Sequence, residues 1–332
     1  MTDKIKILII DANNMFFRAY CASPALNSNG EHIGGILGFL YSLQKRIKDV
    51  DPHNVFIVWD GKGGSKKRRE IREDYKDGRK PPKPLRLNRA HDIERTEEEE
   101  TKSLYYQQSV LIELLTNLPY MQVCEPGVEA DDFISYICNK YNDKDKYIKV
   151  IVSNDKDFIQ LTNESTLLFR PAEDKYVTYK SWIEENKIHP VNMALSRAIE
   201  GDNADNLDGV KGVGRKTIAK KYPFLSENKH ITLTEFKEIL IDHEKNDCTT
   251  SSKILESFDK VQKNYEIMQL HVPMIPAISS QKISEDIAAF VPSFNTENFK
   301  NILTKEGISG GFQLLYNHCY KLTKENWYGR NS

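Results

Sequence analysis

The stretch IKILIID, Ile5–Asp11, sets the class of fold. It is apolar and mostly β-branched up to its final acid, which is typical of a buried strand. Two more strands of this kind are predicted at Val55–Trp59 and Ile148–Val152, and helical patterns separate the three. This alternation predicts an α/β fold with a mostly parallel central sheet flanked by helices.

Acids follow each of these strands. Asp11 ends the first, Asp60 follows the second, and Asp155 and Asp157 come shortly after the third. In open α/β sheets, ligands bind at the carboxyl ends of the strands. We therefore expect the three strand ends to converge on one cleft.

Two other segments add carboxylates. Gly127–Ile137 is predicted to be a helix with three acids in its first turn, and Gly201–Asn206 holds a further pair at a spacing of three. The helix dipole alone would favour acids in a first turn by about 0.3–1 kcal/mol each, so the helix is informative only beside the other acids. The candidates for one site are Asp11, Asp60, Glu129, Asp131, Asp132, Asp155, Asp157, Asp202 and Asp205.

Nine carboxylates at one site need compensating cations, because like charges at close range disfavour the ionised forms. An all-oxygen ligand set selects a hard ion such as Mg²⁺ or Mn²⁺. Two such ions about 3.5–4 Å apart activate water and stabilise a leaving oxygen in phosphodiester hydrolysis. Calcium is the structural alternative, but these acids lack the alternating positions of a calcium loop.

A basic region separates the second strand from the next predicted helix. Residues 62–95 hold thirteen basic residues against six acids, and three prolines at positions 81, 82 and 84 exclude a helix interior there. Thr96 then reads as a helix N-cap, with Glu99 three residues on. For the four glutamates that begin this helix, a solvated first turn is the favoured interpretation over a metal site.

Glycines at 209, 212 and 214 predict a tight turn that opens a helix near Arg215. Such a turn and the helix that follows suit a DNA phosphate. The spacing matches neither a Walker motif nor a dinucleotide-binding fingerprint. A helix–hairpin–helix that grips the duplex backbone fits better.

Bulk composition says less than these patterns. The chain has 332 residues, 47 Lys and Arg against 48 Asp and Glu, and 39% hydrophobic residues, which suits about two globular domains. Its five cysteines lie far apart, so neither a disulfide framework nor a zinc cluster is expected. No apolar run reaches the ~20 residues that span a bilayer, and a cytoplasmic, reducing location is expected.

The chain resembles the 5′-nuclease family, which includes bacteriophage 5′-3′ exonucleases (flap endonucleases), phage ribonuclease H and the 5′-nuclease domain of bacterial DNA polymerase I. The resemblance covers about residues 5–225. Its motifs stand in order at Ile9–Asp11, Val58–Asp60, Tyr75–Arg79, Arg95–Glu99, Gly127–Asp132, Ser153–Phe158, Gly201–Asn206 and Gly212–Gly214.

The resemblance implies a PIN-like fold with a helical arch and a helix–three-turn–helix motif. A catalytic domain would occupy residues 1–180, with the arch at about 62–105. A helical DNA-binding region would occupy residues 181–332, with the helix–three-turn–helix at about 200–222 and a C-terminal tail of unassigned role. The proline-containing insertion at 80–94 departs from the family's arch.

The resemblance also implies roles for single residues. Asp11, Asp60, Glu129, Asp131 and Asp132 would surround one Mg²⁺, and Asp155, Asp157, Asp202 and Asp205 would serve a second, with Mn²⁺ able to substitute. Arg18, Lys76 and Arg79 would act near the scissile phosphate, and Tyr75 would stack on a base. Duplex binding would fall to Lys211, Gly212, Gly214, Arg215, Lys216 and Lys220, with K⁺ held by backbone carbonyls of the same motif.

The predicted function is a structure-specific 5′-nuclease that removes flaps and RNA primers in phage DNA replication, in the host cytoplasm. Expected partners are DNA with a 5′ flap or overhang, RNA–DNA hybrid, and single-strand-binding protein or other replication proteins, and the expected state is a monomer with no membrane contact. A related metal-dependent ribonuclease is the main alternative, and a non-catalytic nucleic-acid-binding module is a third.

Overall fold

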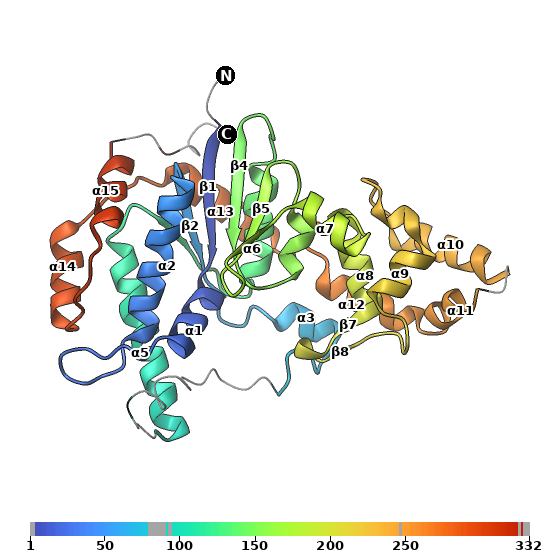
Figure 1. The fold of residues 1–332 in the computed structure, drawn as a ribbon, viewed down its shortest axis with the longest axis horizontal. Helices are drawn as coiled ribbons and strands as arrows, with labels where there is room; N and C mark the ends of the chain where they lie inside the picture. Colours follow the sequence, from blue (N-terminus) through green and yellow to red (C-terminus); the bar gives the residue numbers. More distant parts are fainter. Residues whose placement is uncertain (1–3, 79–90, 92–94, 246–247, 325–326, 328–332) are drawn as a thin grey trace.

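Strand β1 (Ile5–Asp11) runs through the middle of the sheet, between β2 (Asn54–Val58) and β4 (Tyr147–Val152), and is parallel to both. The computed structural model describes residues 4–78, 91, 95–245, 248–324 and 327 (Figure 1). Strands β3 (Met121–Val123) and β5 (Thr166–Arg170) extend the parallel sheet, and β6 (Lys175–Val177) is antiparallel at one edge, giving the order β3-β2-β1-β4-β5-β6. The predicted α/β class with a mostly parallel sheet is confirmed.

Side chains of β1 alternate between two buried faces, because successive residues of a strand point to opposite sides. Leu8 and Ile10 pack on one face, and Ile7 and Ile9 on the other. One face is covered by α1 (Ala12–Ala22), α2 (Gly34–Val50) and α5 (Glu97–Thr116) together with C-terminal helices, and the other by α6 (Ala130–Lys140) and α13 (Ala277–Ala289). Burial on both faces explains the nearly continuous apolar strands.

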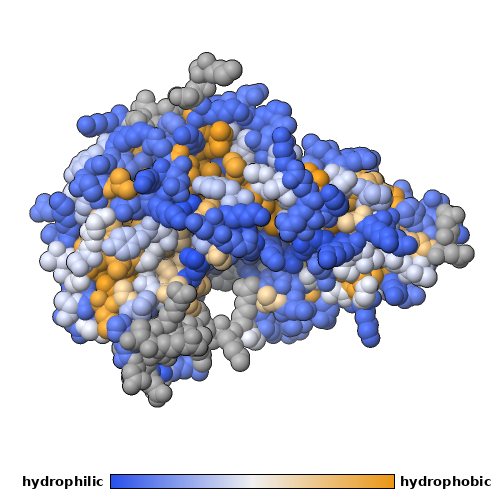
Figure 2. Space-filling view, viewed as in Figure 1, coloured by the Kyte–Doolittle hydropathy of each residue, from blue (hydrophilic) through white to orange (hydrophobic). Residues whose placement is uncertain are grey.

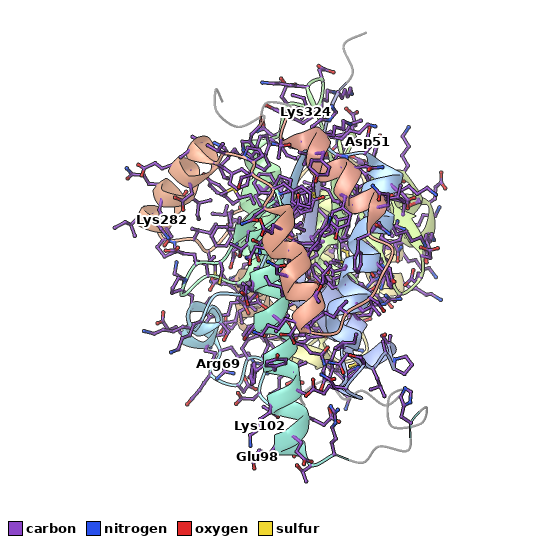
Figure 3. The ribbon with its side chains drawn as sticks, turned by 90° about the vertical axis from the view of Figure 1, so that its left-hand side faces the viewer. Asp51, Arg69, Glu98, Lys102, Lys282 and Lys324 are labelled. Atoms are coloured by element: carbon purple, nitrogen blue, oxygen red, sulfur yellow. The ribbon has the colours of Figure 1, made fainter. Side chains whose placement is uncertain are left out.

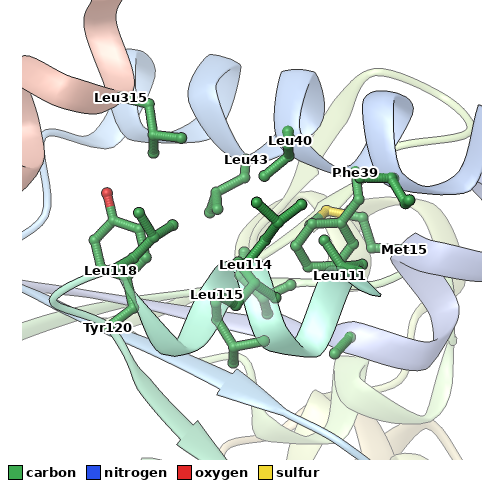
Figure 4. Packing of buried hydrophobic residues seen from close by; sticks show 14 of the residues in the cluster. Met15, Phe39, Leu40, Leu43, Leu111, Leu114, Leu115, Leu118, Tyr120 and Leu315 are labelled. Carbon is green, nitrogen blue, oxygen red and sulfur yellow. The ribbon is translucent and has the colours of Figure 1, made fainter. Parts of the chain in front are cut away.

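Helix α5 shows how local signals and packing combine. Thr96 accepts a hydrogen bond from the Glu99 N–H, and the Glu99 side chain accepts one from the Thr96 N–H, so the predicted N-cap is confirmed. Toward its other end, leucines of α5 pack against α2 and α15 (Gln313–Leu322) (Figure 4). Its first turns carry exposed charges such as the Glu98–Lys102 ion pair of 2.7 Å (Figure 3). Glu97, Glu98 and Glu99 are exposed, as the solvated interpretation expects, whereas Glu100 is partly buried and accepts a hydrogen bond from the Tyr20 hydroxyl (2.7 Å).

A second group of helices has its own core. It comprises α7 (Tyr179–Asn186), α8 (Met193–Glu200), α9 (Arg215–Lys221), α10 (Leu233–Lys245), α11 (Thr249–Glu256) and α12 (Phe258–Met268). Its buried side chains include Leu195, Tyr222, Phe236 and Val261. The short hairpin of β7 (Gly201–Asp202) and β8 (Leu207–Asp208) joins α8 to the glycine turn before α9.

The C-terminal helices do not continue this helical group, which differs from the prediction of one helical region over residues 181–332. Helices α14 (Thr296–Lys305) and α15 (Gln313–Leu322) return to the sheet and pack on α2 and α5. Their apolar residues, among them Phe299 and Leu315, belong to the same core as β1. The physical reason is that α2 and α5 leave apolar surface which two further amphipathic helices cover.

The face in Figure 2 is mostly hydrophilic, with hydrophobic residues in separate groups. Within the described residues, every helix is too short or too polar to cross a bilayer.

Candidate active site

The strand order brings three acid-bearing strand ends to one edge of the sheet. Because β1 lies between β2 and β4, Asp11 has Asp60 on one side and the segment after β4 on the other. The Asp11 carboxylate accepts hydrogen bonds from the Ser153 hydroxyl (2.7 Å) and the Asn14 N–H (3.1 Å). Asp60 accepts bonds from the Ala130 N–H (2.8 Å) and the Asn13 amide (2.6 Å). The two carboxylates are thus held in fixed orientations.

The acids repel one another at this edge. Burial, with added repulsion from Asp60 and Asp155, raises the pKa of Asp11 to about 7. Burial and the charge of Asp155 likewise raise the pKa of Asp157 to about 7. For Asp131, burial raises the pKa well above its usual value, and Asp155 and Glu129 add to the increase. Mutual repulsion of this kind needs a cation at the centre of the group.

Arg68 supplies part of the compensating charge. This residue of α3 (Lys66–Ile71) has a side chain that is only 3% exposed, and its Nη1 lies 2.5 Å from Glu129 and 2.8 Å from Asp132. Its Nε also donates to the Ile267 carbonyl (2.9 Å). Glu129 and Asp132 thus share one partner, the Arg68 guanidinium. Glu129 is moreover the N-cap of α6, one residue before the helix begins.

Lys76 reaches the same carboxylate from the other side. Its Nζ lies 2.5 Å from Glu129, and its backbone, in the left-handed conformation at φ 59°, donates to the Asp205 carbonyl. Burial alone would raise the pKa of Glu129, but Lys76 and Arg68 together hold it below its usual value. Lys76 therefore stands between the acid group and the β7–β8 hairpin.

Arg197 bridges the remaining acids. From α8, its Nε lies 3.0 Å from Asp157, and its Nη2 pairs with Asp202. Asp205 lies close enough to Asp155 to raise the pKa of the latter, although burial is the main cause. The four acids predicted for a second metal thus form one charged group with Arg197.

Sequence reasoning missed the roles of Arg68 and Arg197. Arg68 sits in a run of four basic residues, and nothing in the run distinguishes the one that is buried. Arg197 precedes Gly201 by four residues, so one helical turn separates it from the acid pair that follows. That spacing is the signal that would have indicated it.

The donor chemistry fits a hard divalent cation. All candidate donors are carboxylate oxygens, and burial, with added repulsion between acids, raises the pKa of Asp11 and Asp131 among them. Among the described residues, no group of three His, Cys, Asp or Glu side chains is placed to hold one ion. Within the described residues, arginine or lysine ion pairs hold Glu129, Asp132, Asp157 and Asp202, whereas Asp131 and Asp155 make none.

The other predicted catalytic residues are placed differently. Arg18 on α1 is exposed and donates to the Pro171 carbonyl (3.0 Å). Arg79 lies outside the described residues, as does most of the predicted insertion at 80–94. Tyr75 is only 3% exposed and packs against Leu207 and Ile267, so its ring offers no free face to a base. The burial of Tyr75 therefore argues against the predicted stacking on a base.

The glycine turn presents lysines to solvent. Helix α9 begins at Arg215, as predicted, and Lys211, Lys216 and Lys220 are exposed. Arg215 instead points inward: its Nη2 lies 2.6 Å from Glu200, and its guanidinium lies over the Trp182 ring. The lysines are therefore available for phosphate contact, whereas Arg215 anchors the helix to its neighbours.

Gly209 is required for the close packing of this turn. A Cβ built there would lie 2.0 Å from the Glu200 carbonyl oxygen. We expect Gly209→Ala to lower the free energy of unfolding by about 1–3 kcal/mol, as overpacking does. Urea denaturation would measure this. Gly214→Ala is the control, since its Cβ meets nothing within 4 Å. Equal stability of both variants would contradict the prediction.

The fold and site define a class of α/β proteins with an acidic centre at the carboxyl edge of a parallel sheet. Residues 6–188 match the family model of the 5′-3′ exonuclease N-terminal resolvase-like domain. A 5′-3′ exonuclease of Aquifex aeolicus is 33% identical over 223 residues, covering 65% of this chain and 69% of that protein. A thermostable DNA polymerase I of Thermus thermophilus is 32% identical over 218 residues, but the match spans only 24% of the polymerase.

Solved structures show the same fold. The T5 5′-exonuclease with divalent zinc ions bound has a TM-score of 0.62 and 17% identity, over 91% of this chain and 98% of that one. A T5 flap endonuclease in a complex with DNA and metal ions has a TM-score of 0.59 and 18% identity, over 91% and 97%. The chain belongs to the 5′-3′ exonuclease family. The prediction of a nuclease is thereby confirmed.

Proposed function

We propose that this protein is a structure-specific 5′-nuclease that hydrolyses phosphodiesters with two divalent metal ions where duplex meets a 5′ single strand. The observation that carries the proposal is the group of mutually repelling carboxylates at the carboxyl edge of the sheet, with Lys76 beside it. Removal of flaps and RNA primers during DNA replication is the corresponding biological role. The DNA complex of the T5 flap endonuclease supports a DNA partner.

Two groups of acids would hold the metal ions. Asp11, Asp60 and Asp131 would serve one ion, and Asp155, Asp157, Asp202 and Asp205 the other. Mg²⁺ is the proposed ion and Mn²⁺ its substitute, because the donors are all oxygen. When bound, such ions supply an activated water and stabilise the leaving oxygen. Asp132, held by Arg68 and by the Met274 N–H, is assigned to positioning Glu129 and α3 instead.

Basic side chains would act on the substrate phosphate. Lys76 is the nearest described cation to Glu129 on the hairpin side, and a free Nζ there would stabilise negative charge that develops on the scissile phosphate. Arg18 and Arg79 would act near the same phosphate, as the family resemblance implies. Arg197 would release Asp157 and Asp202 to a metal ion and neutralise phosphate charge in turn.

Duplex binding would fall to the segment from α8 to α9. Exposed Lys211, Lys216 and Lys220 would neutralise backbone phosphates without reading sequence. Gly212 at φ 77° and Gly214 let the backbone approach a strand, and a K⁺ ion on carbonyls of this turn is part of the proposal. Residues 1–180 would then carry the chemistry, and the helical group through α12 would carry the duplex.

The function is tested with a 5′-labelled flap duplex in Mg²⁺, beside a single-stranded RNA of the same length. Cleavage at the junction, lost with EDTA and restored by Mn²⁺, is the expected result. A pure sample that leaves the flap intact in Mg²⁺ and Mn²⁺ from pH 7 to 9 would disprove the proposal. Cleavage of the RNA alone would instead favour the related ribonuclease.

Two lysines are expected to affect different steps. Lys76→Ala should lower kcat by about 10²–10³ with a small change in Kd, as loss of a charge-stabilising group does. Lys216→Ala should weaken duplex binding and reduce the slope of log K against log salt by about 0.9, the value for one phosphate contact. Single-turnover kinetics and salt titrations of binding measure the two. Identical effects of both variants on binding alone would refute this division.

A further inference from the structure

A cavity of about 340 Å³ lies between α1, α2 and the turn from β5 to β6 (Lys175–Val177). Met15, Val152 and Phe169 make its floor apolar. The proposed function gives most of its lining no role, although Arg18 stands at its edge. The cavity is large enough for a phosphate together with part of the attached nucleotide.

Three cations line this cavity against a single acid. Arg46 is the buried one: its side chain is 4% exposed, its guanidinium lies 3.8 Å from the centre of the Phe169 ring, and its Nη2 is 2.8 Å from Asp49. Lys45 and Arg18 lie at the open side. A preorganised guanidinium on an aromatic floor, with exposed cations at the rim, is suited to binding an anion.

A carboxylate already marks the position of the anion. Asp174, in the turn before β6, lies 3.0 Å from Lys45 Nζ and 3.9 Å from Arg46 Nη2. Its side chain is 67% exposed, and exposed ion pairs of this kind contribute little to stability. A phosphate, with more acceptor oxygens, can replace the Asp174 carboxylate on these cations.

The wall of this cavity is joined to the acidic site. The Asn154 side chain accepts a hydrogen bond from the Ala172 N–H (2.7 Å), and its Nδ2 donates to Asn14 Oδ1 (3.1 Å). Asn154 follows Ser153, whose hydroxyl donates to Asp11, and precedes Asp155. An anion bound in the cavity therefore lies next to the strand ends that carry the acids.

We propose that this cavity binds a backbone phosphate of the nucleic-acid substrate, close along the strand to the phosphate that is cleaved. Lys45 and Arg46 bind this phosphate, and Asp174 is the carboxylate that it displaces. The inference rests on the proposed function, because it assigns the phosphate to the substrate of the acidic site. A free phosphate ion would bind to the same cations, and the experiment below distinguishes it from a phosphate of the substrate.

Opposite effects of two substitutions test the proposal. Binding of a labelled flap duplex is measured by fluorescence anisotropy in EDTA, where nothing is cleaved. Lys45→Gln should weaken binding about three- to tenfold and reduce the salt slope by about 0.7–0.9, as loss of one phosphate contact does. Asp174→Asn should tighten binding about two- to fivefold, because it removes the competing charge. Asn also tolerates the positive φ of 48° at this position.

Lys48→Gln is the matched control, since Lys48 is exposed on the same helix but does not line the cavity. Its affinity should equal that of the wild type. The proposal is overturned if Lys45→Gln and Asp174→Asn change affinity in the same direction or not at all, which is the behaviour of a structural ion pair. It is also overturned if Lys45→Gln weakens the binding of inorganic phosphate but leaves the binding of the duplex unchanged. Failure of the wild type to cleave the flap would instead count against the proposed function.

Discussion

Asp131→Asn should abolish cleavage almost completely, with kcat falling by about 10³-fold or more. The reason is that burial and repulsion from Asp155 and Glu129 disfavour the charge of Asp131 despite the nearby Lys76, so under the proposed function a metal ion balances this charge. Loss of several kcal/mol of charge stabilisation in the transition state corresponds to about this factor. The measurement is single-turnover cleavage of the labelled flap, and Asp155→Asn should behave in the same way.

Stability measurements separate this effect from misfolding. Burial disfavours the charged form of Asp131, so a neutral Asn should leave the metal-free protein as stable as the wild type or more stable. Mg²⁺ should raise the melting temperature of the wild type more than that of the variant. Asp286→Asn, at an exposed position of α13, is the control and should change neither property. If Asp131→Asn cleaves the flap at the wild-type rate, Asp131 is not part of the active site.

Arg68→Met is expected to have the largest effect on stability, with a loss of about 3–5 kcal/mol in the free energy of unfolding. The substitution keeps the length of the side chain but leaves Glu129 and Asp132 buried without their common cation. It also frees the Ile267 carbonyl at the end of α12. Urea denaturation followed by circular dichroism would measure the change.

Arg69→Met is the matched control one residue away. Arg69 is 48% exposed and lies 3.4 Å from Asp77, so its removal should cost less than about 1 kcal/mol. Adding Asp132→Asn to Arg68→Met should recover part of the lost stability, because one of the unpaired charges is then removed. If Arg68→Met is no less stable than Arg69→Met, then Arg68 does not organise the site. The position of Arg69 is labelled in Figure 3.

Local patterns predicted the sheet and its acids because each depends on neighbours in the sequence. β1 is apolar throughout since both of its faces are buried, and Thr96 caps α5 through Glu99, only three residues away. Asp11 and Asp60 could be placed at one edge because parallel strands share the direction of their ends. These inferences needed no knowledge of how distant segments pack.

What the sequence could not predict depends on pairings between distant segments. The partner of Glu129 is Arg68, 61 residues earlier, and the anchor of Arg68 is the Ile267 carbonyl, 199 residues later. Tyr75, in a basic stretch that suggested exposure, is buried because Ile267 and Leu207 cover it. Arg215 was expected on DNA but pairs with Glu200. Such choices are made by tertiary packing.

The return of α14 and α15 to the sheet affects the order of events during synthesis. Lys321 pairs with Asp51, 270 residues earlier, and Phe299 and Leu315 complete the core around α2. At about 5–20 residues per second, the ribosome needs about 15–50 s between making these two ends. Until then the part of α2 that packs on α15 has no cover, and the nascent chain must keep that surface from aggregating. Helices α14 and α15 thus finish the domain that begins with β1.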